Sequence, residues 1–247
     1  MIKKVVVSAA GHGTRMLELS KDKPKHLIEV EQKPFLAYLL DNVFTAGYQE
    51  VILVVGYKQE AMQAFVASYT FGGAPQNISL VSQFEILGPK EQGDYGTACP
   101  LKCVKEQVKG EDFISLVGDN FYTVEDLKAM DKDDAFCYVA GRVEEHPEKF
   151  GVLIENGQFL KEIIEKPKTF VGNLVNTSLY KFTPDVFEKL PLIGKSVRGE
   201  YEITDVISLL AKDGKVKIVT TKNYWMDFGR PEDIEKFQGY LKDEKSK

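Results

Sequence analysis

The chain has few cysteines, no basic excess and no long apolar run. Its 247 residues include three cysteines, Cys99, Cys103 and Cys137, which are too few and too irregularly spaced for a disulfide framework. The formal net charge is −5, whereas nucleic-acid-binding proteins carry a basic excess or stripe. No segment has the length of a membrane span, and the N-terminus lacks the features of a signal peptide. These absences predict a cytoplasmic protein that binds neither nucleic acid nor membranes.

The most informative segment is a glycine turn directly after the first apolar strand. Residues 2–9 predict a buried strand, and Gly11 and Gly13 follow it closely. Two glycines let the backbone turn tightly and bring bare N–H groups against phosphate oxygens. Arg15 and Lys25 add fixed positive charge shortly afterwards. This combination predicts a site for a nucleoside triphosphate.

Two commoner glycine motifs do not fit this turn. A dinucleotide-binding fold needs a third glycine or alanine where Met16 stands, and an acidic residue near the end of the second strand, where the chain has Leu53 to Gly56. A Walker-type phosphate loop needs Gly-Lys followed by Ser or Thr, and the turn contains no such triplet. The sequence therefore argues against a nicotinamide-dependent oxidoreductase and against a Walker-type enzyme.

Two aspartates each follow a strand-like apolar segment. Asp119 stands at the end of the predicted strand 113–117, where an open parallel sheet places its ligand crevice, and Asp227 follows a second such segment. A strand-end aspartate is also a common turn former. If both carboxylates converge on a triphosphate, their charges repel by roughly 4 kcal/mol at about 4 Å and an effective dielectric of about 20. Hard oxygen ligands of this kind favour Mg²⁺, so we expect Asp119 and Asp227 to form a magnesium site.

The two halves of the chain differ in pattern. Residues 1–134 alternate strand-like and helix-like segments, which predicts a mostly parallel sheet flanked by helices, with one helix running from Thr97 toward Lys109. Residues 135–247 show short strands and hairpin signals, and the last residues, 244–247, are expected to be frayed. We therefore expect one Rossmann-like, mixed α/β domain over residues 1–247, with the second half as a smaller lobe for a second substrate.

Six ordered elements resemble the sugar-1-phosphate nucleotidylyltransferases, the nucleoside-diphosphate-sugar pyrophosphorylases. The first is the glycine turn with the Pro-Lys pair that ends at Lys25. The others are LVGDNFY (116–122), EKP (165–167), NTSLY (176–180), RGEYEITD (198–205) and WMDFG (225–229). The resemblance is greatest to glucose-1-phosphate thymidylyl- and uridylyltransferases and covers nearly the whole chain. No hexapeptide repeat occurs, so we expect no left-handed β-helix tail.

The resemblance implies a role for each matching residue. The nucleotide would be bound by Ala10, Gly11, Gly13, Thr14, Gln92, Gly96 and Thr97, of which the last three would lie at the pyrimidine base. The sugar phosphate would be bound by Gly151, Glu165, Lys166 and Asn176. The catalytic residues would be Arg15, Lys25, Asp119, Lys166 and Asp227, with Asp119 and Asp227 holding Mg²⁺. The alternative for Thr97 is a helix cap.

The implied reaction is attack of a sugar-1-phosphate oxygen on the α-phosphorus of UTP or dTTP, with pyrophosphate as the leaving group. The nucleophile is already an anion near neutral pH, so no general base is required. Glucose 1-phosphate is the expected acceptor. Two residues depart from the family pattern. Ser178 replaces a usual glycine and is expected to narrow the sugar pocket, and Arg230 replaces a threonine and would add a cation near the metal. His12, in the glycine turn, is expected to point outward.

Two other functions stay open. One is a cytidylyltransferase that acts on a sugar or a phospho-alcohol. The other is a catalytically silent homologue that binds nucleotide sugars and regulates a partner, although the retention of five charged site residues argues against it. A monomer and a homo-oligomer are both compatible with the sequence.

Overall fold

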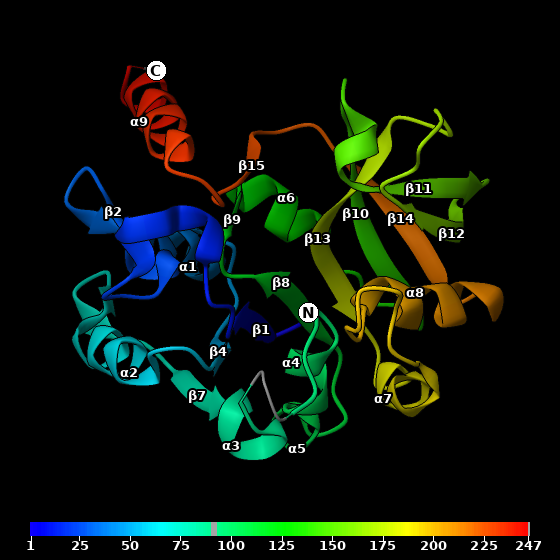
Figure 1. Cartoon of the computed structure of the whole chain (residues 1–247), viewed down its shortest axis with the longest axis horizontal. Helices are drawn as coiled ribbons and strands as arrows, with labels where there is room; N and C mark the ends of the chain where they lie inside the picture. Colours follow the sequence, from blue (N-terminus) through cyan, green and yellow to red (C-terminus); the bar gives the residue numbers. More distant parts are fainter. Residues whose placement is uncertain (90–92, 247) are drawn as a thin grey trace.

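One mixed β-sheet runs through the molecule (Figure 1). The computed structural model describes residues 1–89 and 93–246. Within them the nine strands of this sheet follow the order β10-β14-β12-β11-β13-β8-β1-β4-β7. The first half of the chain contributes the parallel strands β1 (Lys4–Ala9), β4 (Glu50–Val55), β7 (Ile78–Ser82) and β8 (Phe113–Val117). The remaining strands are β10 (Cys137–Val143), β11 (Gly151–Asn156), β12 (Phe159–Glu165), β13 (Leu174–Phe182) and β14 (Val216–Thr221).

The central parallel strands are apolar because both of their faces are covered. Val5 and Val7 of β1 join one buried cluster, and Val6 joins the cluster on the opposite face. Helices cover both faces, and their bounds are α1 (Phe35–Thr45), α2 (Gln59–Ser68), α3 (Gln83–Leu87), α4 (Cys99–Lys102), α5 (Lys105–Val108), α6 (Val124–Ala129), α7 (Val186–Lys189), α8 (Ile203–Lys212) and α9 (Glu232–Lys245).

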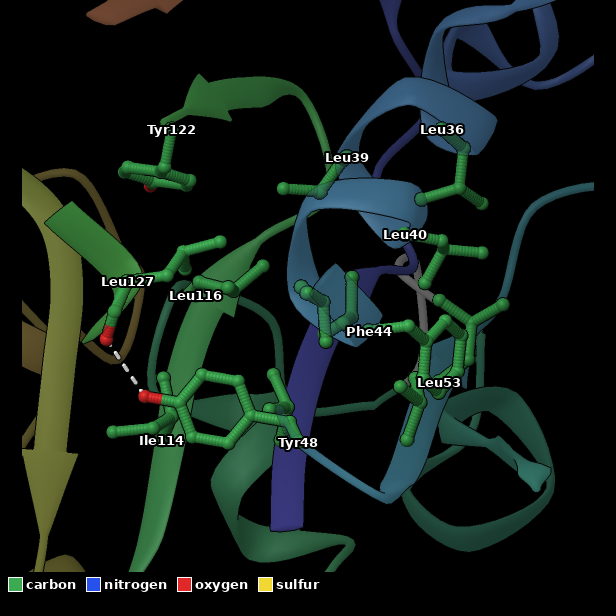
Figure 2. Packing of buried hydrophobic residues seen from close by; sticks show 14 of the residues in the cluster. Leu36, Leu39, Leu40, Phe44, Tyr48, Leu53, Ile114, Leu116, Tyr122 and Leu127 are labelled. Carbon is green, nitrogen blue, oxygen red and sulfur yellow. Dashed lines mark hydrogen bonds between the residues drawn. The ribbon is translucent and has the colours of Figure 1, made fainter. Parts of the chain in front are cut away.

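The first cluster is built on α1. Figure 2 shows Leu36, Leu40 and Phe44 of this helix turned toward Leu53 of β4, with Leu39 nearer Leu116 of β8. These positions recur at helical spacing, so one stripe of the helix packs on the sheet. On the opposite face, α4, α5 and α8 pack against the strands.

The second half of the chain extends the same sheet. Strand β13 pairs antiparallel with β8, in the register Leu179 opposite Leu116, and also with β10. The predicted hairpin is present as β11 and β12, and its turn places Gly157 at φ +62°. The mixed α/β sheet with flanking helices that the sequence predicts is therefore confirmed. None of the described helices is both long and apolar enough to span a membrane.

Two predicted segments are wrong in detail. The helix expected from Thr97 toward Lys109 is two short helices, α4 and α5, because the backbone leaves the helical region at Val104 (φ −114°, ψ 7°), a β-branched residue with low helix preference. The frayed end expected over residues 244–247 is wrong for its first two residues, because α9 continues to Lys245, and Lys247 lies outside the described residues. Phe237 of α9 is fully buried, and this packing holds the helix in place.

Candidate active site

A cavity of about 230 Å³ lies at the carboxyl ends of β1 and β8, where a parallel sheet places its ligands. Six residues of the predicted site line it, namely Ala10, Gly11, Lys25, Gly96, Thr97 and Asp119. Thr14 and Arg15 follow in the 3₁₀ helix η1 (Thr14–Ser20) and are exposed, and Gln92 lies outside the described residues. The structure therefore brings four of the seven predicted nucleotide residues, Ala10, Gly11, Gly96 and Thr97, to one cavity together with Lys25 and Asp119.

The glycine turn packs directly on Lys25. Gly13 has φ +66°, and a Cβ atom at this position would lie 3.1 Å from Cβ of Lys25. The Gly13 carbonyl accepts hydrogen bonds from the Met16 N–H at 2.9 Å and the Ser20 hydroxyl at 2.9 Å. The second glycine is needed both for its left-handed backbone and for this close approach.

Lys25 and Asp119 form an ion pair inside the cavity. Their side chains are 10% and 19% exposed, so solvent screens the pair only weakly. Burial acts to raise the pKa of Asp119, but the charge of Lys25, the neighbouring His26 and hydrogen bonds to the carboxylate together outweigh burial and hold this pKa below its usual value. Burial, with Lys25 as the second cause, lowers the pKa of neighbouring His26 to about 3, so this imidazole is neutral at pH 7.

Asp227 reaches the same place through a short antiparallel ladder. Strand β9 (Asn120–Tyr122) pairs with β15 (Trp225–Asp227), with Asp227 opposite Asn120. The Phe228 N–H donates to the Asp119 carbonyl at 2.7 Å. Because Asp119 precedes β9 and Asp227 ends β15, the two aspartates are diagonal neighbours across this ladder.

The pKa of Asp227 indicates that four charged side chains lie close together. Burial and then the charge of Asp119 raise the pKa of Asp227 to about 6, while Lys25 and Arg15 act in the opposite direction. A Cβ atom at Gly229 would lie 3.3 Å from Oδ1 of Asp227 and 3.4 Å from Nη2 of Arg15, so both side chains flank this glycine. Two cations and two carboxylates thus meet beside the glycine turn.

In the described part of the chain, no group of three or more His, Cys, Asp or Glu side chains is arranged to hold a metal ion. Asp119 and Asp227 form a pair of carboxylates only. Any metal ion bound between them would therefore need further oxygen ligands from water or from a substrate.

Gly96 and Thr97 connect the cavity to the start of α8. Gly96 has φ +134°, and a Cβ atom there would lie 2.3 Å from the carbonyl oxygen of Tyr201, so only glycine fits. The Thr97 hydroxyl accepts the Ile203 N–H at 2.8 Å and bonds Glu202 Oε2 at 3.2 Å. Thr97 is therefore a helix cap, but for the distant helix α8 and not for a helix of its own segment.

Gln83 is a cavity residue that the sequence reasoning missed. It is 3% exposed, and its Oε1 atom is buried without a hydrogen-bond partner among the described residues. It lines the same cavity as Lys25 and Asp119. The available signal was its place directly after β7, because polar residues at the carboxyl ends of parallel strands face the ligand crevice.

A second cavity of about 170 Å³ holds three of the four predicted sugar-phosphate residues, Gly151, Glu165 and Asn176. Gly151 lies opposite Glu165 in the β11–β12 ladder. Thr97 lines both cavities. Lys166 is exposed, has φ +44° and does not line either cavity. Arg198 also lines the second cavity, where it donates to buried Glu202 at 2.9 Å. Arg198 belongs to the RGEYEITD element, but the sequence alone assigned it no role.

A β-bulge shapes the wall of the second cavity. Asn176 pairs with Gly141 and Tyr180 with Val139, so three residues of β13 stand opposite one residue of β10. Ser178, at the centre of the bulge, has φ +60°. Its N–H donates to Asn176 Oδ1 at 2.9 Å, and Asn176 Nδ2 donates to the Tyr180 hydroxyl at 2.7 Å. The usual glycine at this position is explained by the left-handed backbone.

Two side chains lie elsewhere than the sequence suggested. Arg230 is 63% exposed and lies 3.7 Å from Glu232 at the start of α9, so it belongs to the surface and not to the charged centre. The His12 ring does not point outward. It packs among Tyr57, Phe84 and Tyr95, because the turn folds back over neighbouring loops.

The chain is similar to several known proteins. A family model described as nucleotidyl transferase matches residues 4–244. The chain is 34% identical over 250 residues to the UTP–glucose-1-phosphate uridylyltransferase AglF of Haloferax volcanii, covering 98% of this chain and 97% of that protein. It is 30% identical over 236 residues to a bifunctional sugar-1-phosphate nucleotidylyltransferase/acetyltransferase of Sulfurisphaera tokodaii, covering 94% of this chain and 53% of that protein.

A solved structure shares the fold. The crystal structure of a UDP-glucose pyrophosphorylase in complex with UDP-glucose superposes with a TM-score of 0.84. The match covers 99% of this chain and 100% of that chain at 22% identity. At this identity the likeness shows the fold alone.

Proposed function

The chain belongs to the nucleotidyl transferase family, and on this premise we propose that it transfers a uridylyl group from UTP to a sugar 1-phosphate and releases pyrophosphate. Glucose 1-phosphate is the proposed acceptor, and dTTP is the second candidate donor. The observation that carries the proposal is the meeting of Arg15, Lys25, Asp119 and Asp227 beside the glycine turn. The name of the Haloferax relative supports the choice of UTP and glucose 1-phosphate.

Asp119 and Asp227 would hold Mg²⁺. The fit rests on the chemistry of the donors: both are carboxylates, and the pKa of Asp227 is raised to about 6 by burial and by Asp119, a repulsion that a divalent cation relieves. Few protein ligands suffice, because Mg²⁺ keeps several waters and takes phosphate oxygens. When bound, Mg²⁺ supplies neutralisation of phosphate charge.

The other site residues act by position and charge. The N–H groups of the glycine turn face the triphosphate, and Lys25 and Arg15 offset the negative charge that accumulates on the departing pyrophosphate. The attacking oxygen of the sugar phosphate is already ionised, so the neutral His26 is not needed as a base. We assign the nucleotide mainly to residues 1–134 and the sugar phosphate mainly to residues 135–247. Asp227 of the second half also lies at the nucleotide, and Thr97 of the first half lines both cavities.

Gln83 is proposed to bind the base. Its buried Oε1 atom has no donor among the residues that the structure describes, and an unsatisfied buried acceptor is costly. The N3–H group of uracil or thymine would satisfy it, and the amide nitrogen could donate to an adjacent carbonyl of the base. Gly96 and Thr97 lie in the same cavity. Loss of this amide is expected to weaken binding of the nucleotide more than binding of the sugar phosphate.

The sugar phosphate is proposed to occupy the second cavity. Glu165 and Asn176 offer hydrogen-bonding groups to sugar hydroxyls, and Gly151 leaves room beside them. Arg198 supplies a cation inside this cavity. Lys166 is exposed beside Glu165 and would have to turn inward to reach the phosphate.

The test is a grid of substrates. UTP, dTTP, CTP, ATP and GTP are each combined with several sugar 1-phosphates and Mg²⁺, and pyrophosphate release is measured. We expect the fastest release from UTP with glucose 1-phosphate and none after chelation of Mg²⁺. Preference for CTP would assign the chain to the cytidylyltransferases, and no release from any pair would indicate a silent homologue.

A further inference from the structure

We propose that His12 is a positioning residue, whose ring clamps the glycine turn to the base side of the nucleotide cavity. The inference rests on the proposed function only in that a nucleotide occupies this cavity. His12 lies between Gly11, which lines the cavity, and Gly13, which packs on Lys25. A contact that fixes this side chain therefore restrains the backbone of the turn, whose N–H groups are proposed to bind the triphosphate.

The ring meets aromatic side chains from three separate segments. Its centroid lies 5.0 Å from that of Tyr57, 6.0 Å from that of Phe84 and 6.4 Å from that of Tyr95. Tyr57 follows β4, Phe84 belongs to α3, and Tyr95 lines the nucleotide cavity itself. Tilted aromatic pairs at these separations are favourable contacts. One side chain thus links the phosphate side of the cavity to the side that carries Tyr95 and Gly96.

A glycine near this cluster allows Phe84 to pack closely against the turn. A Cβ atom at Gly56 would lie 2.9 Å from Cε1 of Phe84 and 3.0 Å from the carbonyl oxygen of Ala10. The absence of a side chain at Gly56 therefore lets Phe84 approach the turn. On its other side the turn rests on the aliphatic stem of Lys25, through Gly13. The turn is held between two contacts, and His12 supplies one of them.

Nδ1 of the ring does not explain this packing. Nδ1 of His12 is buried and has no hydrogen-bond partner within residues 1–89 and 93–246. The contacts are made by the ring as a flat, mostly apolar surface, and a phenyl ring offers the same surface without a buried unpaired nitrogen. The clamp account therefore predicts that phenylalanine can replace His12, whereas alanine cannot.

A loosened turn must be ordered when the nucleotide binds, and this cost appears as weaker nucleotide binding. We expect His12→Ala to raise KM for the nucleoside triphosphate about tenfold, with KM for the sugar 1-phosphate and kcat changed less than about twofold. His12→Phe is expected to restore KM for the triphosphate to within about twofold of the parent value and to melt at a higher temperature. His146→Ala, at an exposed histidine, is the matched control and should match the parent protein.

Hydrogen exchange on the free protein gives a readout that needs no catalysis. His12→Ala should speed exchange of the amides in residues 10–16, and His12→Phe should return it to the parent rate. If His12→Ala does not fold, Tyr57→Leu removes the nearest partner ring and should give the same pattern.

Two results would overturn the clamp. Either His12→Ala leaves both KM for the triphosphate and the exchange rates unchanged, or His12→Phe is as impaired as His12→Ala, which would mean that a nitrogen contacts the nucleotide directly. If the parent protein releases no pyrophosphate with any substrate pair, the proposed function fails, while the exchange rates still decide whether the clamp exists.

Discussion

The Lys25 ammonium and the Asp119 carboxylate form an ion pair in the nucleotide cavity, although 94 positions separate them in the chain. Strand β8 ends just before Asp119, and the segment after the glycine turn brings Lys25 alongside. Both side chains are mostly buried. Removal of either partner leaves an uncompensated charge away from water, which is strongly destabilising.

Lys25→Met is expected to lower turnover about 10²- to 10³-fold, the loss typical of removing one electrostatic stabiliser. It should also lower the melting temperature, because Asp119 is left without its counter-charge. Pyrophosphate release and thermal unfolding measure the two effects. Lys21→Met is the control, since Lys21 is 68% exposed in the same segment. Turnover within twofold of the parent would place Lys25 outside the reaction.

Asp227→Asn is expected to separate stability from activity. Burial and repulsion from Asp119 disfavour the charged form of Asp227 in the free protein, as its raised pKa of about 6 indicates. Neutralising it should raise the melting temperature without Mg²⁺ by about 3 °C, which corresponds to roughly 1 kcal/mol for a chain of this size, while pyrophosphate release is lost. A variant that melts lower and stays active would contradict the metal assignment.

The stabilities of variants at Ser178 should follow the reverse of the usual order for glycine and alanine. At ordinary positions alanine is more stable than glycine, but Ser178 has φ +60°, where a Cβ atom costs about 1–2 kcal/mol. In urea unfolding, we expect Ser178→Ala to have a free energy of unfolding roughly 1 kcal/mol lower than that of Ser178→Gly. The value for Ser178→Val should be lower still. Equal stability of the glycine and alanine variants would show that this backbone is not strained.

The cysteines should be unreactive in the folded protein. Burial raises the pKa of Cys99 to about 12 and that of Cys103 to about 11, and it also raises the pKa of Cys137. At pH 8 a thiol reagent such as dithionitrobenzoate should therefore label none of them until guanidinium unfolds the chain, when three react.

The same shifts set a pH dependence of stability. Unfolded thiols lose their protons near pH 8.5, whereas the folded ones keep theirs, so the unfolded state binds fewer protons at alkaline pH. The free energy of unfolding should fall as pH rises from about 9 toward 11. A Cys99→Ala, Cys103→Ala double variant should show a shallower fall, and an identical slope would contradict the assignment.

Sequence patterns predicted the parts of this structure that depend on local signals. The apolar run over residues 2–9 predicted β1, and the hairpin signals of the second half predicted the hairpin of β11 and β12. The place of Asp119 at a strand end was also readable, because a parallel sheet directs such residues to one edge.

The rest depends on which distant segments meet. Thr97 caps α8 across more than a hundred positions, and this pairing of distant segments has no local sequence signal. His12 was expected to point outward because a glycine turn is usually exposed, and only the arrival of Tyr57, Phe84 and Tyr95 covers it. Ser178 was recognised as a departure, but the bulge that explains it involves the pairing of two strands.

The short β9–β15 ladder has a consequence for synthesis of the protein. Asp119 leaves the ribosome with the parallel strands, and its companion arrives only with β15, close to the C-terminus. A nascent chain can therefore form the parallel strands long before Asp227, the second carboxylate, has been synthesised. Under the proposed function, a product truncated before Asp227 would lack one of the two metal-binding carboxylates and would be inactive.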